Sequence, residues 1–186
     1  KSDFAEVRRV HKGAYPQLES WTRQQFASQL DLFPEGQICV EIDGRVVATS
    51  SSLIVNIHDL SDSHTYQDVC EGGMIRTHDP DGDTLYGIDI AVDPEFRGHR
   101  FARRIYDARK ELAKSLNLRG IVFGGRMPRY GQYAHEMSPQ EYLAKALRKE
   151  IRDPVIVAQI ANGFVAREVI ENYLPSDKES SGHAVL

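Results

Sequence analysis

Residues 84–102 read TLYGIDIAVDPEFRGHRFA and predict a strand, a turn and the start of a helix in succession. The predicted strand covers residues 84–92, where apolar and β-branched residues predominate, and Asp93-Pro94 ends it. After Gly98 apolar residues return at helical spacing, and they predict the buried stripe of a helix: Phe101, Ile105, Ala108, Leu112 and Leu116. A helix that begins at such a turn presents backbone N–H groups without intrahelical partners, and these groups suit a diphosphate.

Two familiar phosphate-binding motifs do not match this turn. It contains no Gly-Lys-Ser/Thr, which excludes a P-loop, and its glycine spacing does not fit G-x-G-x-x-G, which excludes a dinucleotide fingerprint. Arg97 and Arg100 nevertheless add positive charge to the turn, so we expect an anionic group to bind there.

The same residues resemble the signature of the GNAT superfamily of N-acyltransferases. In that signature a strand often ends near Val-x-Pro, and R/Q-x-x-G-x-G/A then opens a helix. Val92-Asp93-Pro94 ends the strand here, Arg97 matches the first position and Ala102 the last. Arg100 stands where the family has its central glycine, and its Cβ narrows the approach to the loop amides.

The resemblance implies an α/β fold in a single domain over residues 1–186. This fold has a mixed central sheet, splayed near strands 84–92 and 120–125, with helices on both faces. We expect Ser20 to cap the second helix and Ser138, in a Ser-x-x-Glu capping box, to cap a later one. The remaining predicted elements are a helix from Phe4 to Tyr15-Pro16, a helix over 21–32, a hairpin of strands 37–42 and 45–57 across Asp43-Gly44, a strand over 120–125, helices over 139–150 and 154–163, and strands over 164–174 and 183–186.

The resemblance also implies a co-substrate, acetyl-CoA or another acyl-CoA, and no metal. Pantetheine would follow the predicted strand at Ile90, Ala91 and Val92. The pyrophosphate would bind the residues of the turn: Arg97, Gly98, His99, Arg100, Phe101 and Ala102. The acyl group would pass directly to a small-molecule amine, which makes the chain a transferase.

Asp89 is the candidate general base, because it is the only carboxylate inside the predicted strand. The alternative is a charged residue on a solvated face, or one paired with an arginine. In many GNAT enzymes a tyrosine four residues before a Gly-Phe pair protonates the leaving thiolate. Counting back from Gly163-Phe164, that position holds Gln159, which has no acidic proton to donate. The candidate replacements are Tyr130, Tyr133, Tyr142 and Tyr173.

The C-terminal half resembles a more particular group, the GNAT domain fused ahead of a nitrilase-type carbon–nitrogen hydrolase. The residues that carry this resemblance are Gly124–Pro128, Tyr130, Tyr142, Asp153-Pro154 and Asn172–Pro175. It covers about residues 84–186, whereas residues 1–83 match only in the order of elements. The resemblance implies a downstream hydrolase domain in a longer chain and leaves a homodimer open.

Length and composition exclude several classes of protein. The chain has 186 residues, of which 41% are hydrophobic and 27% charged, so it is neither disordered nor collagen-like. No apolar run is long enough to cross a bilayer, and the two cysteines suggest no metal motif. We therefore expect a cytoplasmic protein with no membrane partner.

The segment 58–83 is predicted to be a polar, acidic loop. Its three histidines lie among aspartates, but their spacings fit no metal-ligand motif. A solvated loop and a surface that attracts a cationic amine both remain as interpretations of its charge.

The distribution of charge leaves two alternative functions open. Residues 97–152 carry 14 Lys/Arg and 5 Asp/Glu, a net charge of +9, whereas the rest of the chain carries −13. A nucleic-acid-binding module would use the basic helix after the turn (Arg100, Arg103, Arg104, Arg109, Lys110 and Lys114), but no base-reading or stacking groups are interleaved, so we expect no nucleic acid. A non-catalytic acyl-CoA-binding or regulatory module for a downstream enzyme is the main alternative, because Arg100 and Gln159 depart from the family pattern.

Overall fold

The computed structural model describes residues 3–186 and divides into two compact units. The first contains the residues up to Leu60 together with Gln67–Val122, and the second contains Ser61–Tyr66 together with Phe123–Leu186. The expected mixed α/β class is confirmed, because the first unit has a sheet with both antiparallel and parallel neighbours.

The sheet of the first unit has the order β1-β2-β3-β4. Its strands are β1 (Ile38–Ile42), β2 (Arg45–Val55), β3 (Thr84–Val92) and β4 (Gly120–Val122). β1 and β2 form the expected hairpin, and the turn residues Asp43 and Gly44 have φ of 49° and 78°. Such positive angles match a two-residue turn to the twist of the strands, which explains why Asp-Gly predicts it.

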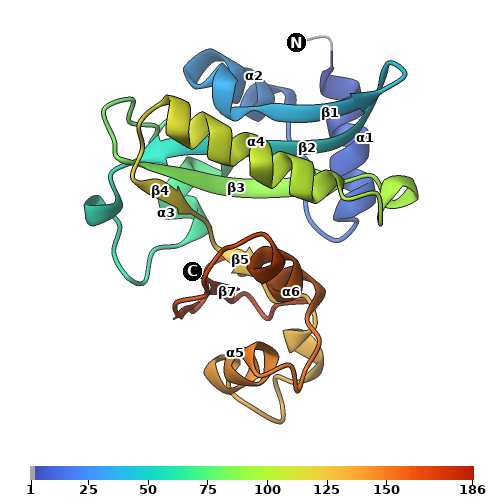
Figure 1. Ribbon diagram of the computed structural model, residues 1–186, viewed down its shortest axis with the longest axis vertical. Coiled ribbons are helices and arrows are strands. Elements are labelled where there is room, and N and C mark those ends of the chain that lie inside the picture. Colours follow the sequence, from blue (N-terminus) through green and yellow to red (C-terminus); the bar gives the residue numbers. More distant parts are fainter. Residues whose placement is uncertain (1–2) are drawn as a thin grey trace. The chain divides into compact units, whose positions relative to one another are not determined.

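Helices cover both faces of this sheet, as expected (Figure 1). On one face lie α1 (Phe4–Ala14) and α2 (Arg23–Leu32), and on the other lies α4 (Phe101–Ser115). Val10 packs with Val46 under α1, and Val47 packs with Ile105 under α4. Each such buried aliphatic side chain stabilises the fold by about 1.5–3 kcal/mol.

The predicted N-cap of α2 is wrong by two residues. Thr22 is the cap, not Ser20, and its hydroxyl accepts from the Gln25 amide at 3.2 Å while Gln25 Oε1 accepts from the Thr22 amide at 2.7 Å. A capping box needs Glu or Gln three residues after the cap. Of the two candidate caps, Thr22 has such a residue at that position and Ser20 does not.

The buried face of α4 is also only partly as predicted. Phe101 and Ile105 are buried, but Leu116 is 41% exposed. The buried line continues instead through Tyr106, Arg109 and Ala113. Arg109, one of the six cations counted in the basic helix, therefore lies inside the unit and is not available at its surface.

A bulge and a splay shape β3. The pairing with β2 passes from Ser51–Asp89 to Ser52–Gly87, so Ile88 is an extra residue in β3. β4 pairs with β3 only through residues 84–86, and β3 continues beyond that point without β4 beside it. The expected splay between these strands is thereby confirmed.

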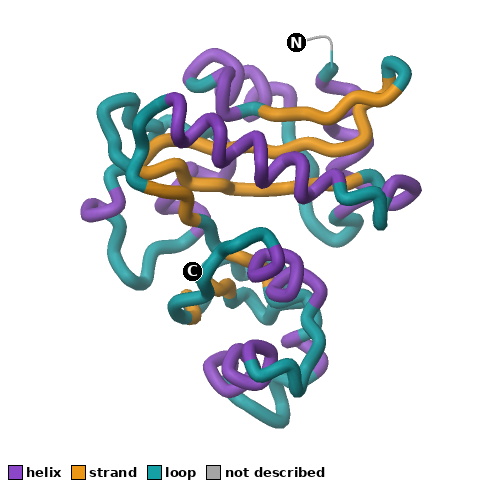
Figure 2. Tube along the Cα trace, viewed as in Figure 1, coloured by secondary structure: helices purple, strands orange, loops and turns teal. Residues whose placement is uncertain are grey.

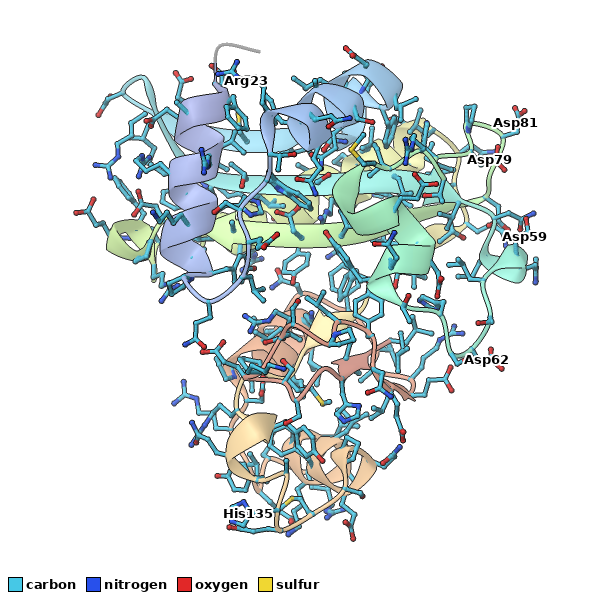
Figure 3. All side chains as sticks on the ribbon, turned by 180° about the vertical axis from the view of Figure 1, so that it is seen from behind. Arg23, Asp59, Asp62, Asp79, Asp81 and His135 are labelled. Carbon is cyan, nitrogen blue, oxygen red and sulfur yellow. The ribbon has the colours of Figure 1, made fainter. Side chains whose placement is uncertain are left out.

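The acidic segment is more ordered than a solvated loop. It begins within the 3₁₀ turn Ile57–Asp59 and contains α3 (Tyr66–Cys70) and the 3₁₀ turn Glu71–Gly73. Val69, Cys70 and Ile75 are fully buried, whereas Figure 3 shows Asp59, Asp79 and Asp81 on its outer loops. The apolar residues of the segment thus complete the core while its aspartates remain outside.

The second unit is built largely of loops (Figure 2). Its small antiparallel sheet has the order β5-β7-β6, from β5 (Gly125–Arg126), β6 (Val169–Ile170) and β7 (Ala184–Val185). The predicted strand over 164–174 is therefore far shorter, and the one over 120–125 is divided between β4 and β5. The division falls at Phe123-Gly124, where a Cβ on Gly124 would lie 2.5 Å from the Tyr173 ring.

Two helices of this unit begin where the sequence predicts. α5 (Pro139–Leu147) starts with the expected Ser138–Glu141 capping box. α6 (Pro154–Ala161) starts at Asp153, whose carboxylate accepts from the amides of the first turn. Around them pack the buried residues Met127, Tyr130, Tyr142, Leu143, Ile156 and Val185.

Candidate functional site

Asp89 lies in the interior of the first unit, not on a solvated face. Its Oδ1 accepts from the Ser51 amide at 2.5 Å, and its Oδ2 lies 2.6 Å from Nε2 of His11. The two side chains are only 9% and 7% exposed. The site therefore joins a carboxylate of β3 to an imidazole of α1, which the sequence did not pair.

His11 reaches Asp89 because α1 lies against this face of the sheet. Its ring packs between Trp21, at 5.2 Å between centroids, and Tyr15, at 6.0 Å. The helical spacing assigns His11 to the buried face of α1, and an imidazole at a core position is the signal that sequence reasoning missed.

Arg109 fixes the backbone behind Asp89 from the other face of the sheet. Its Nη2 donates to the carbonyls of Ser51 at 2.7 Å and Asp89 at 2.5 Å, and its Nε donates to the Ser52 hydroxyl at 3.0 Å. Burial lowers the pKa of Arg109, and the charge of Asp89 opposes that shift. A Cβ on Gly87 would lie 2.6 Å from the guanidinium, so glycine leaves room for it beside the bulge.

The turn before α4 has the backbone shape that a glycine would favour. Arg100, which replaces the expected glycine, has φ 62° and ψ 23°, in the left-handed region, and Gly98 has φ 85°. A non-glycine residue in that region costs about 1–2 kcal/mol. The amides of the first turn of α4, from Phe101 onward, have no intrahelical acceptor, which leaves an anion-binding helix terminus.

The charged side chains around this turn are exposed. Arg97 lies 3.4 Å from the Ala14 carbonyl through Nη2, and Arg100 makes no capping hydrogen bond. The His99 ring stacks on Phe101 at 6.0 Å, and its Nδ1 lies 3.2 Å from the Phe96 and Arg97 carbonyls. His99 thus supports the turn, while the two arginines keep their charge at the surface.

The three candidate pantetheine residues have different surroundings. Ile90 and Val92 pack toward α4, and Ala91 is buried toward α1. The Ile90 carbonyl accepts a hydrogen bond from the Tyr15 hydroxyl, so a pantetheine amide at that oxygen would compete with Tyr15.

Asp93 anchors the end of β3, and sequence reasoning missed this role. Its carboxylate is 5% exposed and accepts from Arg9, from Arg45 at 3.0 Å and from the Glu95 amide at 3.1 Å. Burial opposes ionisation of Asp93, but these hydrogen bonds outweigh it and hold its pKa below the usual range.

The tyrosines of the second unit that are candidate general acids take part in its packing. Tyr142 donates to Asp153 at 2.8 Å, and burial together with that carboxylate raises its pKa well above the usual range. Tyr130 donates to the Met137 carbonyl at 3.1 Å, and burial raises its pKa as well. The remaining tyrosines also have ring partners, since Tyr133 packs on Tyr142 and Tyr173 on Tyr66. Raised pKa values make Tyr130 and Tyr142 poorer proton donors.

Gln159 packs closely inside this unit. A Cβ on Gly125 would lie 2.6 Å from its amide group, so the glycine admits the glutamine. A tyrosine at position 159 would need more room than this contact leaves.

The histidines of the acidic segment have separate partners. His58 lies 3.1 Å from Arg119, His64 contacts the Ser61 carbonyl at 2.7 Å, and His78 accepts from the Ile54 amide at 3.0 Å. Over residues 3–186, no three His, Cys, Asp or Glu side chains gather as a metal site would require. Within the same range, no helix is long and apolar enough to span a bilayer.

This chain is similar in sequence to known proteins. A model of the acetyltransferase (GNAT) family matches residues 4–135. Probable hydrolase YhcX of Bacillus subtilis (strain 168) is 41% identical over 186 residues, which is 100% of this chain but only 36% of that protein. Uncharacterized N-acetyltransferase YkwB of the same strain is 36% identical over 172 residues, covering 92% of this chain and 76% of that protein. The chain thus spans about a third of one relative and three quarters of the other.

Solved structures share the fold at low sequence identity. The loading GNATL domain of CurA from Lyngbya majuscula has a TM-score of 0.85 at 17% identity, covering 99% of this chain and 90% of that one. The GNAT-like decarboxylase GphF, in complex with isobutyryl-CoA, has a TM-score of 0.78 at 19% identity, covering 99% of this chain and 92% of that one. They confirm the expected fold. The match to a relative named a hydrolase fits the expected likeness to a GNAT domain ahead of a hydrolase. On the family match over residues 4–135, together with relatives at 41% and 36% identity, this chain belongs to the GNAT family of acetyltransferases.

Proposed function

We propose that this chain transfers an acetyl group from acetyl-CoA to the nitrogen of a small-molecule amine. The observation that carries the proposal is the turn before α4, where Arg100 adopts the left-handed conformation and a helix N-terminus opens beside it. Free amides and two exposed arginines favour a pyrophosphate at Arg97–Ala102. Ile90, Ala91 and Val92 then hold the pantetheine arm along the edge of β3 that β4 does not cover.

Asp89 and His11 supply the proton acceptor in this proposal. Asp89 takes the proton of the attacking amine, and His11, whose Nε2 lies 2.6 Å from Asp89 Oδ2, holds that carboxylate in position. The amine nitrogen bonds to the carbonyl carbon, and the bond from that carbon to sulfur breaks. The sulfur leaves as a thiolate and takes its proton from water. A thiol with a pKa of about 8.5 is a good leaving group, so the proposed transfer does not require a tyrosine at the position of Gln159.

The test measures binding and turnover separately. Saturating acetyl-CoA should raise the melting temperature, because a ligand that binds only the folded state stabilises it, whereas adenosine alone should not. Arg100→Ala should weaken acetyl-CoA binding by about 1.5–3 kcal/mol, and Arg148→Ala, which removes an exposed arginine of the second unit, should not. CoA release is then followed with a panel of primary amines. No stabilisation by acetyl-CoA would contradict the proposal at its first step.

Two other functions would give different outcomes. A non-catalytic acyl-CoA-binding module, which Arg100 and Gln159 suggest, would bind acetyl-CoA and release no CoA with any amine. A decarboxylase is the second alternative, because GphF, which has the same fold, is named one. It would cleave carbon dioxide from a carboxylated acyl-CoA without an amine, and mass spectrometry of the thioesters detects this loss.

A further inference from the structure

The first unit contains an open cavity of about 100 Å³ beside Asp89. Its walls come from α1, α2, the segment between them, and the three strands β1, β2 and β3. Figure 1 shows both helices on this face of the sheet. Cys39, which is exposed, also lines the cavity, so it reaches the surface there.

Unpartnered polar atoms are concentrated at this cavity. Over residues 3–186, six buried side-chain polar atoms have no hydrogen-bond partner, and all six belong to residues that line it. They are His11 Nε2, Gln37 Oε1, Thr49 Oγ1, Ser50 Oγ, Ser51 Oγ and Asp89 Oδ2. Ser50 lies between Thr49 and Ser51 in β2, so its hydroxyl faces the other side of the sheet and the remaining five atoms carry the argument. Native proteins pair nearly all buried polar groups, so such a cluster calls for a ligand.

Two of the atoms next to the cavity, the amide oxygen of Gln37 and the carboxylate oxygen of Asp89, are hydrogen-bond acceptors, and the hydroxyls of Thr49 and Ser51 can accept as well as donate. Gln37 already donates through Nε2 to the carbonyls of Phe33 at 2.9 Å and Ser52 at 3.1 Å, which leaves its oxygen. Asp89 contributes a carboxylate oxygen, and the register of β2 with β3 places Thr49 and Ser51 on the same face as Asp89. Asp89 and His11 lie at ion-pair distance, yet neither facing atom has a hydrogen bond of good geometry. A group with several N–H donors and a positive charge matches this set.

The rest of the wall is apolar and limits the size of the ligand. Trp21, Phe26 and Leu30 line it. A cavity of about 150 Å³ holds benzene, so about 100 Å³ holds roughly four non-hydrogen atoms. An unbranched alkylamine of up to three carbons fits, and a longer molecule would extend past Cys39.

We propose that this cavity binds the aminoalkyl head of the acceptor, with its nitrogen at Asp89 and His11 and its short chain against Trp21. This inference rests on the proposed acetyl transfer, because only an acyltransferase has an acceptor. Its test measures amine binding alone and does not depend on the transfer. The ligand class is a primary amine with an unbranched aminoethyl or aminopropyl end, and carboxylates and aromatic amines are excluded.

The test uses the protein alone, without acetyl-CoA. Trp21 is the only tryptophan of the chain and lines the cavity, so its fluorescence reports on binding. Titration with propylamine should change this signal saturably, while 1-propanol, propionate and benzylamine at equal concentrations should not. An equal response to propionate, or no response to propylamine, would overturn the proposal.

A matched pair of variants locates the site. Thr49→Val removes one cavity hydroxyl at nearly constant shape and should weaken propylamine binding about five- to tenfold, the effect of one hydrogen bond. Thr84→Val removes a buried threonine hydroxyl that bonds to Asp83 outside the cavity, and should leave binding unchanged. Equal effects of the two variants would place the amine elsewhere.

Different results would contradict the proposed acetyl transfer and the proposed amine cavity. Saturable propylamine binding that Thr49→Val weakens, in a protein that never releases CoA, supports the cavity and removes acetyl transfer. Acetyl transfer to propylamine whose KM for amine is the same in Thr49→Val keeps the proposed function and removes the cavity.

Discussion

Arg109 and Asp89 meet through the backbone, since Nη2 of the arginine donates to the Asp89 carbonyl at 2.5 Å. The Asp89 side chain meanwhile contacts His11 on the opposite face of the sheet. A fully buried cation on one face therefore fixes the strand from which a buried carboxylate projects on the other. The bulge at Ile88 is what directs these groups, because it interrupts the pairing of β3 with β2 at this point.

Gly87→Ala should destabilise the protein by about 1–3 kcal/mol, the usual cost of overpacking. The added methyl group would lie 2.6 Å from the Arg109 guanidinium, which three hydrogen bonds hold in place. Urea unfolding measures the change. Gly120→Ala is the matched control, because nothing lies within 4 Å of a Cβ there. Equal free energies of unfolding for the two variants would mean that Arg109 moves aside freely.

Arg100→Gly should stabilise the ligand-free protein by about 1 kcal/mol, because glycine accepts a positive φ without strain. Arg100→Ala removes the same charge but keeps the Cβ, so it should give no such gain. The comparison of the two variants by urea unfolding separates backbone strain from charge. Equal stability of the two would show that strain at this position is negligible.

The sequence predicts the elements whose signals are local. Asp43-Gly44 specifies its hairpin, and the Ser138–Glu141 box specifies the start of α5, because each signal depends only on neighbouring residues. The N-cap of α2, which was predicted wrongly, could also have been predicted from neighbouring residues. Thr22 has Gln25 at the capping-box position, whereas three residues after Ser20 stands Arg23.

The site could be predicted only in part, because its partners come from distant elements. The spacing places Asp89 on β3 and His11 on the inner face of α1, but nothing local shows that they meet. The sequence counts Arg109 among the cations of a basic helix, and arginine is rarely fully buried. Its burial depends on strand carbonyls of Ser51 and Asp89, which only the folded sheet brings within reach.

His78 should make stability fall in mild acid. Its Nδ1 accepts from the Ile54 amide and its ring stacks on Phe33, and burial lowers its pKa in the folded state, against a smaller opposing effect of Asp79. As the pH falls below the ordinary histidine pKa of about 6.5, the unfolded chain takes up a proton that the folded chain resists. The free energy of unfolding should therefore decrease from about pH 7.5 toward about pH 5.

The variant His78→Asn isolates this effect, because asparagine retains an acceptor but does not titrate. Its unfolding free energy in urea should depend less on pH than that of the unchanged protein. His135→Asn, which alters a largely exposed histidine, should keep the original pH dependence. Parallel pH profiles for the unchanged protein and His78→Asn would remove His78 as the cause.

Asp89→Asn should lower the rate of CoA release with an amine acceptor by about 10²–10⁴-fold, the usual contribution of a general base. The variant keeps the shape of the side chain, but its amide cannot take up the proton of the amine. His11→Gln should cost a similar factor, and the double variant should cost little more than either one, because two residues that act as one unit are not additive. Acetyl-CoA should still raise the melting temperature of all three variants, since the amides of Gly98 and Phe101 do not depend on Asp89 and His11.

Asp81→Asn, at an exposed carboxylate, is the control for a general loss of charge. Losses that multiply in the double variant would mean that the two residues act independently, and an undiminished rate in Asp89→Asn would exclude Asp89 from the mechanism.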